Sequence, residues 1–141
     1  MGTTVGLSSS TRQLFQDEYF TVFVDERLRL VRTVRSDKPF NAIEELDGLF
    51  ARLGSALDTL DRSRYGLLAD IRAATGRNDP QFEAALDRLR PLWIDGFRKV
   101  GVLVRSTVGQ MQVQRHARRD GRQRLISKDE DELLKYLTEE D

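Results

Sequence analysis

Five polar residues gather just before the proline at position 80, in a pattern that can bind an anion. They are Arg72, Thr75, Arg77, Asn78 and Asp79. Proline is favoured at the first position of a helix, so a helix is predicted to begin at Pro80. The free backbone N–H groups of that helix would face these side chains, an arrangement that suits a phosphate, another ligand or a protein partner.

The same segment also has a purely structural interpretation. Gly76 and Asn78 are common turn-forming residues. Asp79 stands where a helix N-cap is expected, and such a cap stabilises a helix by about 1 kcal/mol. Both interpretations remain open from the sequence.

A second group of candidate residues is basic. Seven arginines and lysines lie between positions 105 and 128, against one acidic residue, Asp120. Four of them are candidate anion-binding residues: Arg115, Arg118, Arg119 and Arg122. The alternatives are a solvated face or pairing with the acidic residues at 129–141. The basic stretch contains no aromatic residue for base stacking, and the 23 basic and 23 acidic residues of the chain cancel, so nucleic acid is not an expected partner.

Several kinds of chemistry are excluded by what the chain lacks. Without cysteine there is no disulfide, thiolate nucleophile or cysteine-ligated metal, and the lone His116 offers little for zinc or a catalytic triad. Acidic pairs such as Glu44 and Glu45 fit helix starts better than acid–base catalysis. We therefore expect no enzymatic activity, no metal and no cofactor. A cysteine-free chain without a run of about 20 apolar residues also fits a cytoplasmic protein that does not span a membrane.

The pattern of apolar residues predicts one α/β domain over 14–138, between a flexible segment at 1–13 and an acidic end at 139–141. Apolar runs predict five strands, at 19–26, 27–35, 65–71, 99–104 and 122–126. Helices are predicted after Asn41 (a capping box with Glu44), from Pro80 with a kink or break at Pro91 and an end at Gly96, from Ser106 or Thr107, and after Ser127 (a capping box with Glu130). The order β-β-α-β-α-β-α-β-α indicates a mixed sheet of about five strands covered by about four helices.

Each predicted helix has an apolar stripe with which to cover the sheet. The first stripe includes Leu46, Phe50, Leu53 and Leu57 at steps of three and four. The third is shorter and consists of Val108, Met111 and Val113. Trp93 falls on the stripe of the second helix and is predicted to be a core residue, although with Pro91 and Phe97 it could line a groove.

This order of elements resembles the STAS family, the sulfate-transporter and anti-sigma-factor-antagonist domain, in its stand-alone bacterial form. The resemblance covers residues 17–137, and Asp70-Ile71-Arg72 matches the start of the family's strand–loop–helix segment. At the family's spacing, Asn78 falls on the Asp of its phosphorylation motif and Gln81 on the Gly. Asp79 and Pro80 fall on the two hydroxyl residues, so the usual phosphorylated hydroxyl is absent.

The resemblance implies a non-enzymatic regulatory or adaptor domain that acts through protein–protein contacts and is not controlled by phosphorylation at the usual place. Its partner would be a kinase-like anti-sigma factor or another signalling component. The expected partner-binding residues are Arg72, Thr75, Arg77, Asn78, Asp79 and Phe82, with Asp79 either a fixed negative charge or only a helix cap.

Two further possibilities concern other partners. A small-molecule or lipid-binding domain would use an apolar pocket beneath the second helix, with Arg72 or Arg77 holding an anionic head group. Two copies of the chain could also associate through an open edge of the first hairpin.

Overall fold

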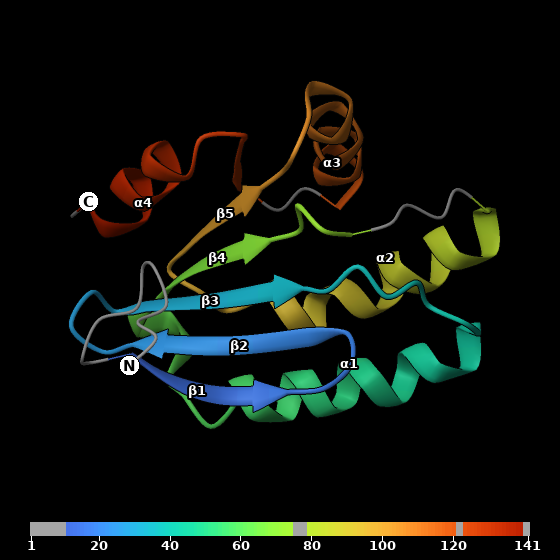
Figure 1. The fold of residues 1–141 in the computed structure, drawn as a ribbon, viewed down its shortest axis with the longest axis horizontal. Coiled ribbons are helices and arrows are strands. Elements are labelled where there is room, and N and C mark those ends of the chain that lie inside the picture. Colours follow the sequence, from blue (N-terminus) through green and yellow to red (C-terminus); the bar gives the residue numbers. More distant parts are fainter. Residues whose placement is uncertain (1–10, 75–78, 121–122, 140–141) are drawn as a thin grey trace.

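The computed structural model describes residues 11–74, 79–120 and 123–139, which form a six-stranded mixed sheet with helices on both faces. The strands lie in the sheet in their order along the chain, and β3 to β6 run parallel while β1 and β2 pair antiparallel. Their bounds are β1 Thr11–Gln16, β2 Phe20–Asp25, β3 Leu30–Arg35, β4 Gly66–Asp70, β5 Lys99–Leu103 and β6 Leu125–Ser127. The α/β class and the mixed sheet confirm the prediction (Figure 1).

Strand β1 was not predicted, and it corrects two expectations. Thr11 to Gln13 belong to this strand rather than to a flexible segment, while residues 1–10 lie outside the described part of the chain. The β1–β2 pairing shifts register between Gln13 and Phe15, so adjacent Leu14 and Phe15 both pack on the core and the period of two is lost. Because β1 pairs with β2, the hairpin edge proposed for self-association is covered.

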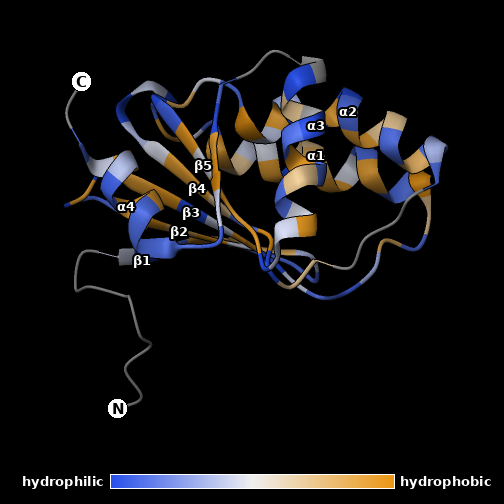
Figure 2. Cartoon of the chain, turned by 90° about the horizontal axis from the view of Figure 1, so that it is seen from above, coloured by the Kyte–Doolittle hydropathy of each residue, from blue (hydrophilic) through white to orange (hydrophobic). Residues whose placement is uncertain are grey.

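Four α-helices connect and cover the strands. They are α1 Ile43–Leu57, α2 Pro80–Ile94, α3 Thr107–Asp120 and α4 Glu130–Thr138, with a single 3₁₀ turn, η1 Arg62–Arg64, before β4. Helices α1, α2 and α3 each join neighbouring parallel strands in the same direction across the sheet. Crossovers of one hand therefore place all three on one face, and α4 lies on the other (Figure 2).

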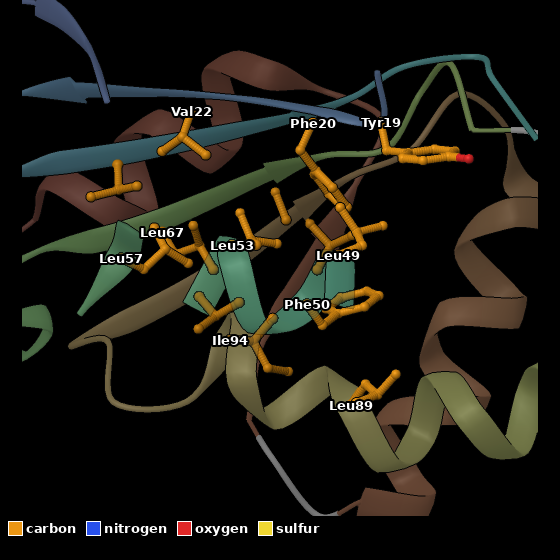
Figure 3. Close-up of a cluster of buried hydrophobic side chains, with 14 of the residues drawn as sticks. Tyr19, Phe20, Val22, Leu49, Phe50, Leu53, Leu57, Leu67, Leu89 and Ile94 are labelled. Atoms are coloured by element: carbon orange, nitrogen blue, oxygen red, sulfur yellow. The ribbon is translucent and has the colours of Figure 1, made fainter. Parts of the chain in front are cut away.

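The main core lies between the sheet and helices α1 and α2 (Figure 3). Phe20 and Leu67 from the strands meet Leu53 and Leu57 of α1, and all four are almost completely buried. The two helices approach closely at Gly54, where an added Cβ would lie 3.1 Å from the carbonyl oxygen of Leu92. A side chain at this position would push α2 away from α1.

A smaller core fills the opposite face beneath α4. Leu133 and Leu137 are fully buried against Leu68 and Leu103 of the parallel strands. Gly101 of β5 permits this contact, since a Cβ there would lie 3.1 Å from the Leu133 side chain. The sheet is thus buried on both faces along β4 and β5, as their continuous apolar sequences indicated.

Two predicted capping boxes are wrong. Helix α1 begins at Ile43 with Ala42 as its N-cap and no side-chain cap, so Asn41 and Glu44 do not form a box. Helix α4 is capped by Asp129, whose carboxylate accepts the N–H groups of Asp131 and Glu132. The Ser127 hydroxyl donates instead to Glu132. In both places a residue nearer the first helical turn took the cap position.

The predicted start of α3 and end of α2 are confirmed, but the predicted break at Pro91 is wrong. The Ser106 hydroxyl accepts the N–H of Gly109 at 3.1 Å, and Gly96 has a positive φ of 89° after the last turn of α2. Helix α2 continues through Pro91 to Ile94 without a break. Pro91 has no N–H to donate to the Asp87 carbonyl, so the helix loses that hydrogen bond but does not end there.

Candidate functional site

A cavity of about 390 Å³ lies between α2 and α3 at the carboxyl ends of β4 and β5. Every element around this end of the sheet contributes side chains to its wall. Apolar groups come from the strands, from α1 and from the two flanking helices: Phe20, Phe40, Phe50, Ala69, Ile71, Leu86, Trp93, Ile94, Val102, Val104, Val108 and Val113. The wall is therefore mostly hydrocarbon and aromatic.

Three aromatic rings form a rigid part of this wall. Trp93 packs edge-on against Phe20, with ring centroids 5.2 Å apart, and Phe50 lies 6.3 Å from the same indole. The indole Nε1–H donates to the buried Thr33 hydroxyl at 3.0 Å, which fixes the orientation of the ring. Trp93 packs against the core as predicted and also lines the cavity, but Pro91 and Phe97, the other residues of the predicted groove, are not among the lining residues.

Six arginines among the described residues also line the cavity, and they differ in exposure and pairing. Arg90 is bound to Asp87 at 2.7 Å. Arg105 and Arg115 are exposed, and Arg35 is only 4% exposed. Arg72 and Arg124 complete the group. Apolar walls combined with several guanidinium groups suit a molecule that has an apolar body and an acidic group.

The guanidinium of Arg72 is held in an ion-pair network. Its Nη2 and Nε atoms donate to the buried Asp70 carboxylate at 2.8 and 3.0 Å, and this hydrogen bonding raises the pKa of Arg72 above its usual value. Arg32 of β3 binds Glu130 of α4 at 3.1 Å and lies 3.9 Å from Asp70. The network therefore joins the loop after β4 to the start of α4.

Of the six predicted partner-binding residues, the structure describes Arg72, Asp79 and Phe82. Thr75, Arg77 and Asn78 lie outside the described residues. The Asp79 carboxylate accepts the N–H of Phe82 at 3.0 Å and is the N-cap of α2, as the structural interpretation predicted. Phe82 is only 3% exposed and packs in the core, so it is not available for direct contact with a partner.

The predicted anion-binding residues divide in the same way. Arg115 lines the cavity, and Arg118 is exposed on α3. Neither forms an ion pair within the part of the chain that the structure describes. The side chain of Arg119, and Arg122 as a whole, lie outside the described residues.

Sequence reasoning missed Arg35, the most buried arginine of the cavity. The strand pattern contains a signal that could have found it. Val31 and Thr33 point into the main core, and Arg35 continues the same face by the period of two. A charged residue on the buried face of a strand needs a polar environment, and here that environment is the end of the sheet beside the cavity.

Other kinds of site were sought in the same residues. Within residues 11–74, 79–120 and 123–139, no group of three or more histidine, aspartate or glutamate side chains is arranged to hold a metal ion. None of the helices in these ranges is long and apolar enough to cross a membrane.

Comparisons with known proteins bear on the fold. No family model matches the chain, and no curated protein matches it. The structure is similar to the crystal structure of an uncharacterised protein of the DUF3478 family from Shewanella loihica PV-4, described as having a SpoIIAA-like fold. The TM-score is 0.54 at 14% sequence identity, over 94% of this chain and 99% of the other. This similarity shows that the chain adopts a SpoIIAA-like α/β fold, in agreement with the STAS-like order of its elements.

Proposed function

We propose that this protein is a non-enzymatic binding domain that holds an apolar molecule with an acidic group in the cavity between α2 and α3. The observation that carries the proposal is the combination of about 390 Å³ of space, mostly apolar walls and several arginines in one place. Binding sites for small molecules generally have this size range and this mixture of hydrophobic surface with a few polar groups.

The polar lining of the cavity supports binding rather than catalysis. Among the described lining residues, Glu83 is the one carboxylate and Ser106 the one hydroxyl. The Ser106 hydroxyl already caps α3 through Gly109. A paired acid and base, or a nucleophile beside a base, would be needed for hydrolytic chemistry, and this set of side chains does not supply one.

The single tryptophan of the chain makes the proposal directly testable, because Trp93 lines the cavity. We expect decanoate, added to the purified protein below its micelle concentration, to change the Trp93 fluorescence in a saturable way. Native mass spectrometry should show one bound decanoate per chain.

Two glycine variants form a matched pair for this experiment. Gly109 lines the cavity, and its added Cβ would meet only ordinary contacts, so Gly109→Phe should place a phenyl ring in the ligand's space. Gly48 is exposed on α1, outside the cavity, and Gly48→Phe is the control. Decanoate binding that survives Gly109→Phe unchanged would place the ligand elsewhere and contradict the proposal.

A second candidate is the regulatory role that the STAS resemblance implies, with a kinase-like anti-sigma factor or another signalling protein as partner. One observation favours it: Val108, at the rim of the cavity, and Met111, one turn further along α3, are 67% and 64% exposed. Exposed apolar residues that lie together are typical of protein contacts.

The second candidate is tested by co-purification from the native host. The wild-type chain is compared with a Val108→Ser, Met111→Ser double variant, and Leu92→Ser, at another exposed apolar position on α2, is the control. A signalling protein retained by wild type and control but lost from the double variant supports the role. Equal retention by all three chains counts against this surface.

A further inference from the structure

Arg35 stands at the end of β3 as an almost completely buried cation. Its Nη1 donates to the carbonyl oxygen of Ser36 at 2.6 Å and its Nη2 to that of Lys38 at 2.7 Å. Nη1 also lies 3.3 Å from the Ser36 hydroxyl. These acceptors are all neutral, so they orient the guanidinium without balancing its charge.

Aromatic rings enclose the same guanidinium. Its central carbon lies 4.2 Å from the ring centroid of Phe40, 5.5 Å from that of Tyr19 and 6.0 Å from that of Phe20. Faces of aromatic rings attract a cation, and they also exclude water from it. The side chain is thus held in one position at the wall of the cavity.

The Asp17 and Asp37 carboxylates attract the charge of Arg35, but neither forms an ion pair with it. Glu45 accepts the Tyr19 hydroxyl at 2.9 Å, and one Asp17 oxygen accepts the N–H groups of Tyr19 and Phe20. Within the described residues, no carboxylate forms an ion pair with Arg35. Burial lowers the pKa of Arg35 below its usual value, but an arginine remains charged in a protein at neutral pH.

A buried cation without an ion-paired carboxylate gains from an anion in the adjacent cavity. A guanidinium has five N–H donors, and the three acceptors of Arg35 leave donors free. Paired and hydrogen-bonded charges are tolerated in protein interiors, whereas a lone buried charge is costly. Arg90 of the wall, which is half-buried, already has Asp87 as its partner.

We propose that Arg35 is the anchor for the acidic group of the ligand, and that the ligand class is an apolar monocarboxylic acid. The inference rests on the proposed function of the cavity and names the chemistry that it selects. A single carboxylate matches the single charge of Arg35, and the rings of Phe20, Phe50 and Trp93 receive the apolar part. Arg105 and Arg115 are exposed and would instead hold a head group that stays in water at the surface of the cavity.

The decisive measurement is the preference for an acid over its neutral analogue. Decanoate and decan-1-ol have the same chain length and differ in charge, so the ratio of their dissociation constants isolates the acidic group. We expect the wild-type protein to prefer decanoate and Arg35→Gln to reduce that preference by about tenfold or more, since a hydrogen-bonded charge contact is lost. Decan-1-ol should bind the variant as well as it binds wild type.

Variants at other arginines test whether Arg35 is the residue that binds the acidic group of the ligand. An Arg105→Gln, Arg115→Gln double variant tests the two exposed arginines of the cavity, and Arg88→Gln, outside the lining, is the control that should leave the preference for decanoate unchanged. Arg35→Lys keeps the charge but not the fork of donors, so it should weaken decanoate binding several-fold without affecting decan-1-ol. If Arg35→Gln does not fold, as circular dichroism would show, the Arg35→Lys comparison decides the question.

The results that would contradict the anchor role of Arg35 differ from those that would contradict the proposed function of the cavity. An acid preference that persists in both Arg35 variants overturns the anchor role while leaving the cavity proposal intact. A preference lost only in the Arg105, Arg115 double variant moves the anion to the surface and also overturns it. If neither decanoate nor decan-1-ol binds, or if Gly109→Phe blocks neither, the proposed function itself fails.

Discussion

One face of the sheet is covered by three helices, but the space beneath them is filled on one side of α2 and hollow on the other. Between α1, α2 and the strands, side chains interlock around Phe20, Leu53 and Leu67 (Figure 3). Between α2 and α3, the same face of the sheet borders a cavity of about 390 Å³. Helix α2 belongs to both regions, so the difference comes from what α1 and α3 bring to it.

A comparison of helices α1 and α3 shows that an apolar stripe does not by itself predict that a helix face is buried. The stripe of α1 is buried, with Leu46, Leu53 and Leu57 at 0% exposure. On α3, Val108 is 67% and Met111 64% exposed, and it is Val113 and Ala117 that pack against the core. A stripe is buried only when its length and volume fill the available space, and the α3 stripe, interrupted by glutamines, does not.

The largest expected effect is the loss of a side chain from the filled region. Leu53→Ala should destabilise the fold by about 3 kcal/mol, because the residue is fully buried and the surrounding side chains relax only partly into the space it leaves. Met111→Ala on α3 should change stability by less than about 0.5 kcal/mol, because its side chain is already exposed. Urea denaturation of both variants measures the contrast. Similar losses for the two would show that α3 is as firmly packed as α1.

Next in size is the removal of the arginine that joins the carboxyl ends of α1 and α2. Arg62 donates to the carbonyl oxygens of Leu92 and Asp95, each at 2.8 Å, and to the Asp58 carboxylate. Arg62→Met should cost about 2 kcal/mol, since several carbonyl groups lose a charged donor. The control is Arg88→Met, which removes a surface pair with Asp47. A loss no larger than that of the control would mean that the two helices hold together without Arg62.

The N-caps of α2 and α3 allow the two regions to be compared through smaller expected losses of stability. Asp79→Ala should destabilise the whole fold by about 1 kcal/mol, because it removes the cap of the helix that both regions share. Ser106→Ala removes the corresponding cap of α3 and should mainly speed amide exchange within α3, since that helix can open locally. Hydrogen exchange with mass spectrometry separates local from global opening. Asp79→Ser should retain most of the stability, and a loss as large as for alanine would argue against a capping role.

The smallest effect concerns titration at the end of the sheet opposite the cavity. The Tyr65 hydroxyl donates to Glu26 at 2.5 Å, which lowers the pKa of Glu26 below its usual 4.5 and raises that of Tyr65 above 10.0. The folded chain therefore binds a proton at Glu26 less readily than the unfolded chain. The stability from this contact is present above about pH 4.5 and lost as the pH falls through the folded pKa. It is present below pH 10 and lost as the pH rises through the folded pKa of Tyr65.

Denaturation of wild type and Tyr65→Phe across this pH range should show a small difference that is constant near neutrality and shrinks at both extremes. Decanoate affinity should be the same in both proteins, because the pair lies away from the cavity. A difference in stability that stays constant into acid would mean that Glu26 is not the partner that matters.

The helices and strands that could be predicted from the sequence are those with a strong pattern of apolar residues. The stripe of α1 and the continuous apolar runs of β4 and β5 led to the right elements in the right order. Strand β1 was not predicted, because a shift in register places the adjacent Leu14 and Phe15 both on the core and removes the alternation typical of a strand. The capping boxes failed because a cap depends on where the first helical turn closes, and the sequence offers several polar residues near that point.

The candidate site was only partly foreseen. An apolar pocket beneath the second helix with Arg72 in its wall was one of the possibilities, and both features are present. The buried anchor Arg35, however, lies on a strand in an earlier part of the chain, and no local pattern connects it with α3. Arg72 itself is bound to Asp70, a contact between residues that sequence spacing alone does not predict.

The sequence by itself determined the α/β class, the order of the elements, the start of α2 at Asp79-Pro80 and the absence of cysteine chemistry. These follow from local periodicity, turn chemistry and composition, which act over a few residues. Only the tertiary structure decided that α3 leaves a hollow beside α2 and that Arg35 lines it without an ion-paired carboxylate among the described residues. Whether a helix fills the space it covers depends on the volumes of side chains brought together from distant segments, and only packing in three dimensions sets that sum.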